Sequence, residues 1–333
     1  MAPASTAPAE VRAHQALEET RQGFPAFRER FEGDWGMTPP ESLREFWAFL
    51  RSLGPADRQA LADLDLAPYG VADLLEEPGR PTRDGIDVRV HGRYYRDPPE
   101  FVTFLHGGSD GLHFGLWFDD GRTCAGVAGY HTDDGDGVGV PQGTPLEVVR
   151  AHLEGSWRDL LDEERAGAPV DERRNRLRGL RALLVAFGVG DPGHEGVDYL
   201  RTLPAARPLP ERVMTLDGGG ALLPRGAVPP RGPQEGAEDH HWYTRVYEEL
   251  TGDPEAVTAA AAEAVRRCAA GDPAQALVLG RDLHWVSQGD PLRERLAAEL
   301  LVAAYRALGR PALAGIVQAH RDHRDLPRVT VLR

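Results

Sequence analysis

The sequence predicts an α+β protein in which amino-terminal helices pack on an antiparallel sheet and a mainly α-helical carboxy-terminal domain follows. Apolar residues recur at helical spacing before residue 65 and again beyond residue 240. Between residues 87 and 140 the pattern changes to short apolar runs separated by Gly and Asp, which is typical of an antiparallel meander. At 333 residues the chain has the length of about two domains, each large enough for its own core.

The amino-terminal elements follow from composition and spacing. Residues near the start are rich in Ala and Pro, so we expect residues 1–20 to form a disordered tail rather than a signal peptide. Helices are predicted from Glu41 to Leu53 and from Arg58 to Leu64. Thr144 opens a third helix with a capping box, and this helix should cover the sheet. The strands of the sheet are predicted at residues 101–105, 113–118, 123–130 and 138–140.

Two adjacent prolines, Pro98 and Pro99, stand directly before the first of these strands. Because proline lacks an N–H group and fixes φ, no helix or central strand can pass through this point. Strand-like apolar positions lie on both sides, at Val88 and Val90 before the prolines and from Phe101 after them. We therefore expect two strands joined by a stiff, charged corner whose aromatic residues pack a small sheet.

The domain boundary is predicted in the polar stretch 166–173. It separates an α+β domain over residues 21–165 from a mainly helical domain over residues 172–325. A helix from Asn175 to Phe187 should open the second domain. Residues 191–236 are dense in Pro and Gly, and they predict a loop region with one short apolar strand.

Three Gly-Asp-Pro sequences punctuate the helical region, with their aspartates at Asp253, Asp272 and Asp290. In each, glycine would end one helix, aspartate would cap the next, and proline would take its first position. The even spacing predicts short helices stacked as antiparallel hairpins. In this interpretation Asp272 has an architectural role, and each cap contributes about 1 kcal/mol of stability.

The composition excludes several functional classes. The chain has no lysine, which excludes lysine Schiff bases and P-loop chemistry. Its net charge of −14 disfavours nucleic acid and anionic membranes as direct partners. Cys124 and Cys268, the only cysteines, predict neither a disulfide framework nor a zinc knuckle. We expect a cytoplasmic protein, and the excess of Ala, Gly, Pro and Arg is typical of a GC-rich bacterial genome.

Two groups of histidines are candidate metal ligands. One is the polar run 238–241, which contains His240 and His241, and the other is the pair His320 and His323. Neither has a second ligand pair nearby, and a solvated helix end explains the second group more simply. Walker A, dinucleotide, nucleophile-elbow and zinc-protease motifs are absent. The sequence therefore predicts no metal and no cofactor.

Four collinear segments resemble the histone PARylation factor family. Residues 94–101, which read Tyr-Tyr-Arg-Asp-Pro-Pro-Glu-Phe, are similar to the central signature of that family. Residues 40–49 and 66–75 are similar to its amino-terminal part, and Ala276–Leu283 is similar to its carboxy-terminal helical motif. The resemblance covers residues 21 to 325. It implies an accessory protein that docks on a poly(ADP-ribose) polymerase and completes the active site of that enzyme.

The resemblance also implies an acidic pair just ahead of the helical motif, whose glutamate acts as a general base on an acceptor hydroxyl. Matched without a gap, these two positions fall on Ala269 and Ala270, and alanine cannot accept a proton. The same match places Asp272 on an acidic position of the motif. A gap of two residues would bring Asp272 nearer to the catalytic position, although its role as a cap already explains it. No catalytic residue is assigned.

A family arginine in the loop before these helices is matched by Arg231, with Arg225 as the second candidate. A bidentate guanidinium there could bind a pyrophosphate or a carboxylate of a partner protein. Together with Asp272, these arginines form the predicted binding surface.

The sequence leaves three functions open. The first is a non-catalytic accessory protein that binds an ADP-ribosyltransferase, or a related protein of ADP-ribose signalling, without supplying the catalytic glutamate. The second is a stand-alone interaction or immunity-type module unrelated to ADP-ribose. The third is an enzyme that acts on an ADP-ribose derivative through His240, His241 or Asp272, which no motif spacing supports. We expect a protein that is not an enzyme by itself.

Overall fold

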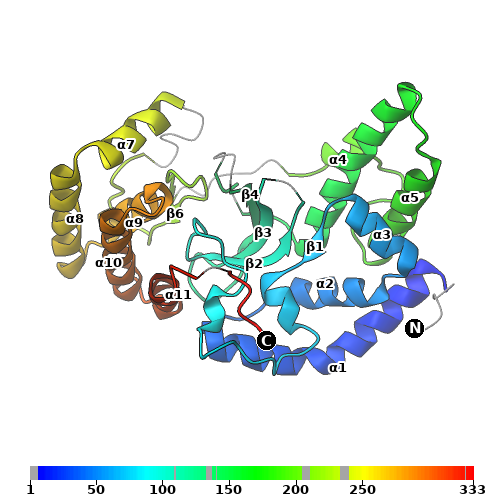
Figure 1. The fold of residues 1–333 in the computed structure, drawn as a ribbon, viewed down its shortest axis with the longest axis horizontal. Coiled ribbons are helices and arrows are strands. Elements are labelled where there is room, and N and C mark those ends of the chain that lie inside the picture. Colours follow the sequence, from blue (N-terminus) through cyan, green and yellow to red (C-terminus); the bar gives the residue numbers. More distant parts are fainter. Residues whose placement is uncertain are drawn as a thin grey trace.

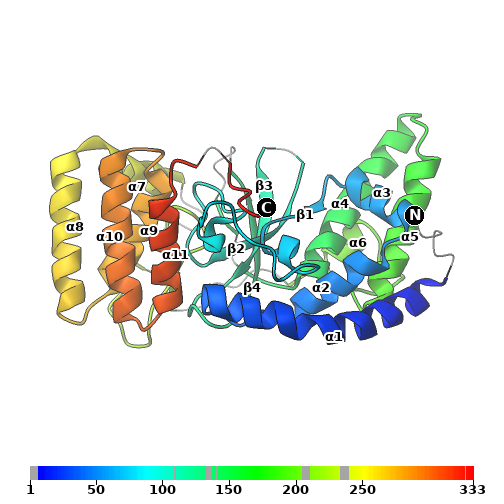
Figure 2. The same cartoon turned by 60° about the horizontal axis from the view of Figure 1, so that its bottom comes forward.

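The computed structural model describes residues 7–108, 110–132, 137–139, 141–204, 211–232, 240–326 and 328–333. The molecule is elongated, with a sheet at its centre and a group of helices at either end (Figure 1). The longest helix, α1, runs beneath the sheet and the amino-terminal helices (Figure 2). This arrangement confirms the predicted α+β class.

The amino-terminal helices are α1 (Ala9–Trp35), α2 (Glu41–Ser52) and α3 (Pro55–Asp63). Because α1 begins at Ala9, the predicted disordered tail is wrong from that residue onward, while residues 1–6 lie outside the described residues. Successive turns of α1 bury one face of the helix, which includes Ala13, Ala16, Phe24 and Phe27, and this packing orders the Ala-rich segment.

The central sheet is antiparallel, in the order β1-β2-β3-β4. Its strands are β1 (Ala67–Pro68), β2 (Phe101–His106), β3 (Leu112–Trp117) and β4 (Gly126–His131). Phe101 pairs with Trp117, and Trp117 pairs with Gly126, so the predicted meander is confirmed. The predicted strand at 138–140 does not form within the described residues 137–139, where Val138 instead donates a backbone hydrogen bond to Asp217.

The segment before the two prolines differs from the prediction. Val88–Val90 forms a short 3₁₀ helix, η2, because the Asp87 side chain accepts the backbone N–H of Arg89 and closes a tight turn. A similar 3₁₀ helix, η1 (Gly70–Leu74), precedes it and packs on β2. The predicted strand around Val88 and Val90 is therefore wrong, whereas the predicted strand from Phe101 is confirmed as β2.

The next helices are α4 (Pro145–Arg165), α5 (Asp171–Ala186) and α6 (Val197–Leu200). The predicted capping box at Thr144 is confirmed, since its hydroxyl accepts the N–H of Glu147 while Glu147 accepts the N–H of Thr144. Contrary to expectation, α4 packs mainly on α2, α5 and α6 rather than covering the sheet. The domain boundary at 166–173 stays a prediction.

The carboxy-terminal region consists of β5 (Arg212–Val213), β6 (Ala221–Leu222), α7 (His240–Gly252), α8 (Pro254–Ala269), α9 (Ala274–Val286), α10 (Pro291–Ala307) and α11 (Pro311–Asp322). Strands β5 and β6 form a small hairpin, and α8 to α11 stack side by side (Figure 2). Asp253 and Asp290 cap α8 and α10 as predicted. The predicted cap at Asp272 is wrong, because α9 begins only at Ala274 and no side chain caps it.

Candidate functional site

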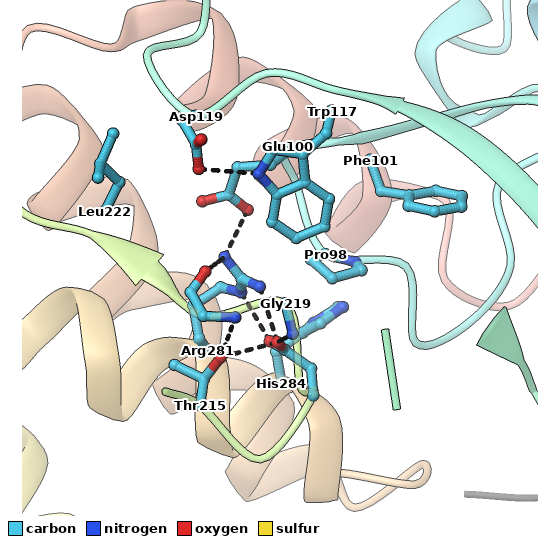
Figure 3. A network of polar contacts seen from close by, with 12 residues as sticks. Pro98, Glu100, Phe101, Trp117, Asp119, Thr215, Gly219, Leu222, Arg281 and His284 are labelled. Carbon is cyan, nitrogen blue, oxygen red and sulfur yellow. Dashed lines mark hydrogen bonds and ion pairs between the residues drawn. The ribbon is translucent and has the colours of Figure 1, made fainter. Parts of the chain in front are cut away.

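A buried arginine of α9, Arg281, joins the carboxy-terminal helices to the central sheet (Figure 3). Its Nε and Nη2 donate to the carboxylate of Asp217, at 2.8 and 2.9 Å, and its Nη1 lies 2.9 Å from Oε2 of Glu100. The guanidinium also covers the ring of Trp117. Burial opposes the charged form, but the two carboxylates outweigh it and raise the pKa of Arg281 above its ordinary value.

This junction explains the acidic residues of the signature segment. Glu100 also accepts a hydrogen bond of 2.8 Å from the hydroxyl of Tyr305 on α10. Asp97 is buried and accepts from Nε2 of His113 at 2.7 Å and from the Tyr130 hydroxyl at 2.6 Å. Both acids are thus committed to holding the sheet, the proline corner and the helices together.

Arg231, predicted from the sequence as a binding residue, is fixed beside this junction. Its Nη2 lies 2.6 Å from Oδ2 of Asp282, the neighbour of Arg281 on α9, and its Nε donates to the carbonyl oxygen of Met214 at 2.9 Å. The guanidinium also lies over the ring of Trp242, 4.8 Å from its centre. Arg231 is therefore a positioned cation and not a freely solvated loop residue.

Asp282 is the buried partner of this cation. Its Oδ1 accepts the backbone N–H of Leu216 at 2.8 Å. Burial raises the pKa of Asp282 to about 6, although the hydrogen bonds from Arg231 and Leu216 act in the opposite direction. The pair can therefore change its charge state in mildly acidic solution.

Arg231 and Asp282 line an open groove of about 340 Å³ between α7, α8 and α9. Its other lining residues are Pro230, Val246, Glu249, Leu250, Ala256, Val257, Ala260, Gln275, Val278 and Leu279. The lining is mostly apolar with one positioned arginine, and such a surface suits a partner side chain that has both an apolar body and an acceptor group. Val228, in the same loop as Arg231, is 73% exposed.

The turn between α8 and α9 lies beside this groove. Ala269 ends α8 and Ala270 follows it, and both are exposed. Asp272 is half-buried, and its Oδ2 accepts from Nε of Arg267 at 3.0 Å. Arg267 also donates to Gln275, a residue of the groove, at 3.0 Å. Asp272 is therefore part of a surface ion pair next to the groove.

The second predicted arginine is placed differently. The side chain of Arg225 is 94% exposed, and its closest carboxylate partner, Glu211, lies 3.7 Å away. The structure thus joins Arg231 to the groove and leaves Arg225 in solvent. Sequence reasoning missed Asp282 and Trp242. The signal for Asp282 was its position beside Arg281, since two adjacent opposite charges stand within a mostly apolar helix.

The structure also bears on metals and membranes. Within the described ranges, no three or more His, Cys, Asp or Glu side chains gather closely enough to hold a metal ion. Glu238 and Asp239, which belong to the polar run 238–241, lie outside those ranges. The expectation that His320 is solvated at a helix end is wrong. The residue is partly buried, and its Nε2 accepts a hydrogen bond from Nη1 of Arg324 at 2.7 Å. None of the described helices is long and apolar enough to span a membrane.

Comparison with known proteins finds relatives of the amino-terminal part of this structure. Residues 27–153 match the family model of Histone PARylation factor 1. The curated Histone PARylation factor 1 of Danio rerio is 30% identical over 95 residues, which cover 28% of this chain and 27% of the relative. That of Mus musculus is 34% identical over 87 residues, or 24% of each chain.

The aligned part thus spans about a quarter of the length of these relatives. The family match contains the signature at 94–101 and ends before α5, so Arg231, Ala269 and Ala270 lie outside it. The chain therefore carries a domain of the histone PARylation factor family, as its signature predicted, and is a distant homologue of Histone PARylation factor 1.

Proposed function

We propose that this protein is an accessory protein of ADP-ribosylation, which binds an ADP-ribosyltransferase without being an enzyme by itself. The observation that carries the proposal is the family domain at residues 27–153. The buried pairs of Arg281 connect this domain to α9, which lines the groove. A partner bound in the groove would therefore be held at a fixed position relative to the family domain.

The groove supports a binding role through its composition. A positioned arginine surrounded by apolar side chains is typical of the residues that dominate protein interfaces. Arg231 keeps its orientation through Asp282, Met214 and Trp242, so little side-chain entropy is lost when a partner docks. We infer that Arg231 is the central contact of the docking surface, and that the exposed turn at Ala270 and Asp272 forms its edge.

The finer part of the proposal is that the protein binds without supplying a catalytic glutamate. Alanines occupy the two positions that the family resemblance assigns to the acidic pair. The nearby carboxylates of Asp272 and Glu263 are paired with Arg267 and Arg266. A guanidinium already engages each carboxylate, so neither is a ready replacement for the base. The partner enzyme would then provide its own base or use an acceptor that needs none.

The test is affinity capture of the full chain from the lysate of its source cell, with partners identified by mass spectrometry. Recovery of an ADP-ribosyltransferase supports the proposal. Binding of that enzyme should weaken at least tenfold in Arg231→Ala, as expected for a central interface arginine. The matched control is Arg225→Ala, an exposed arginine of the same loop region, which should bind like the wild type. Equal binding by all three proteins would show that the groove is the wrong surface.

A second experiment separates binding from catalysis. Ala270→Glu places a carboxylate at the position that the family resemblance assigns to the glutamate. Stimulation of the captured transferase by this variant alone would show that the rest of the machinery is intact and that the natural chain only binds. Stimulation by the wild type at the same level would contradict the non-catalytic assignment.

The alternative is a stand-alone interaction or immunity-type module that keeps the fold and has no connection with ADP-ribose. The alanines at positions 269 and 270 favour it as much as they favour a non-catalytic accessory protein. Capture of a toxin or another unrelated protein, with no transferase, would support this alternative. Turnover of NAD by the pure protein would instead indicate an enzyme.

A further inference from the structure

A small cavity lies between the proline corner, α9, α10 and α11, and shares no residue with the groove around Arg231. It is lined by Arg93, Pro99, His284, Glu294, Ala298, Leu301, Val317, His320, Arg321 and Arg324. Because its walls come from distant parts of the sequence, the cavity exists only in the folded protein. Its polar residues have no part in the docking surface proposed above.

The walls of the cavity carry an excess of positive charge. Three guanidinium groups, those of Arg93, Arg321 and Arg324, face one carboxylate, that of Glu294. Glu294 is already engaged, since it accepts from Nε of Arg324 at 3.0 Å and from the Tyr95 hydroxyl. Arg321 forms no ion pair or side-chain hydrogen bond with any described residue. An anion inside the cavity would therefore meet more positive than negative charge among the lining side chains.

Two buried donors have no acceptor. Nε of Arg93 and Nη2 of Arg324 are buried and form no hydrogen bond with any described residue. The remaining Arg93 nitrogens are occupied, because they donate to the carbonyl oxygens of Phe101, Asp97 and Pro98. An unmatched buried donor costs about 1–3 kcal/mol, and more when it is charged. An acceptor with several oxygens within the cavity would satisfy these groups together.

The pKa values of His284 and His320 are consistent with a positively charged cavity. Burial, together with the cations Arg324 and Arg93, lowers the pKa of His284 to about 3. Burial also lowers the pKa of His320, with Arg93 and Arg324 as the next causes. Both imidazoles are therefore neutral near pH 7, and they leave the arginines as the cations of the site.

The size of the cavity limits the ligand. About 30 Å³ is open to the centre of a water-sized sphere. A sphere of that volume has a radius of about 1.9 Å, and adding the ~1.4 Å radius of water gives a space of about 3.3 Å radius. Such a space matches one tetrahedral oxyanion, so the rest of a phosphate monoester would have to extend out of the cavity.

We propose that this cavity is a binding site for one small oxyanion of the phosphate class, held by Arg93, Arg321 and Arg324. The guanidinium group suits such a ligand, because its planar N–H donors match the oxygens of a phosphate. The bound ion would join the proline corner to α10 and α11, and it would stabilise the folded protein increasingly as its concentration rises above its dissociation constant.

The test is a calorimetric titration of the full chain with sodium phosphate, in a chloride-free gluconate buffer of constant ionic strength. We expect one saturable site and a Tm that rises with phosphate concentration. Ala298→Leu fills the cavity without changing a charge and should abolish binding. Arg321→Gln, at an exposed position that should not affect folding, should weaken binding about tenfold. The control is Arg295→Gln on α10, whose side chain pairs with Glu299 at the surface.

Each outcome decides the proposal. No saturable signal, or equal affinity in Ala298→Leu, Arg321→Gln and the wild type, would overturn the site. Equal binding of chloride would overturn the oxyanion class. AMP and phosphoserine then separate two sources of the same chemistry. Their competition with phosphate would identify a phosphate monoester as the ligand, and the absence of competition would identify the free inorganic ion.

Discussion

Charged residues at the two ends of α9 are in opposite environments. Near its carboxyl end, Arg281 pairs with Asp217 and Glu100, and the three side chains are 0%, 1% and 2% exposed. Before its amino end, Asp272 pairs with Arg267, and these side chains are 37% and 40% exposed. The same helix thus carries a buried ionic junction at one end and a surface ion pair at the other.

The difference shows what each end can do. Breaking a buried pair leaves a charge in the interior without a partner, so the buried end is committed to architecture. An exposed pair is worth little, so the residues at that end can change or bind a partner at small cost to the fold. Arg231 and Asp282 are intermediate, because the carboxylate is buried while the arginine reaches the groove.

The largest effect is expected from Arg281→Met. This variant leaves Asp217 and Glu100 buried without their cation and should lower the free energy of unfolding by about 3–5 kcal/mol. Chemical denaturation in urea measures the loss. The control is Arg266→Met, which breaks the exposed pair with Glu263 and should behave like the wild type. A loss no larger than that of the control would show that the junction is not held by its charges.

The pH dependence of stability tests the same buried end through His284. Its pKa of about 3 in the folded protein lies below the ordinary value near 6.5, so the unfolded chain binds more protons between these values. Stability should therefore fall as the pH falls through this window, by up to about 1.4 kcal/mol per pH unit from this group.

His284→Gln removes this titration and keeps a donor for the carbonyl oxygen of Asp97, which His284 contacts at 2.9 Å. Its stability should depend less steeply on pH than that of the wild type. His14→Gln, at an exposed position of α1, is the control and should keep the original slope. Identical slopes in all three proteins would argue against a neutral, buried His284.

The intermediate pair should give an intermediate effect. Arg231→Ala removes the cation beside buried Asp282, and we expect a loss of about 1–3 kcal/mol at pH 8. Because the pKa of Asp282 is about 6, the acid is largely protonated at pH 5, and the loss should be smaller there. Denaturation at both pH values measures the difference. A loss that is the same at pH 5 and pH 8 would mean that Asp282 does not take up a proton in this range.

Local signals predicted much of this fold. The capping box at Thr144, the strand β2 after Pro99 and the caps at Asp253 and Asp290 all depend on residues a few positions apart, and the structure confirms each. The same signals failed at Ala9–Thr20, where packing against distant residues orders an Ala-rich helix. Local composition cannot show such tertiary packing.

The candidate site was predicted only in part for the same reason. The resemblance supplied Arg231, but its partner Asp282 is 51 residues away in the sequence, and the ring of Trp242 comes from another helix. The junction of Arg281 with Glu100 connects α9 to the residue directly before β2, which is distant in the sequence. Such pairs become visible only once the chain is folded, because no spacing rule connects residues that far apart.

The smallest effects are expected among the three Gly-Asp-Pro sequences. Asp290→Ala removes a real helix cap, whose Oδ1 accepts the N–H of Arg293 at 2.8 Å, and should cost about 1 kcal/mol. Asp272→Ala removes only a surface ion pair and should cost less than about 0.5 kcal/mol. Urea denaturation of both variants makes the comparison. Equal losses would mean that Asp272 caps α9 in solution, and the exposed end of that helix would then be part of the architecture rather than free to bind a partner.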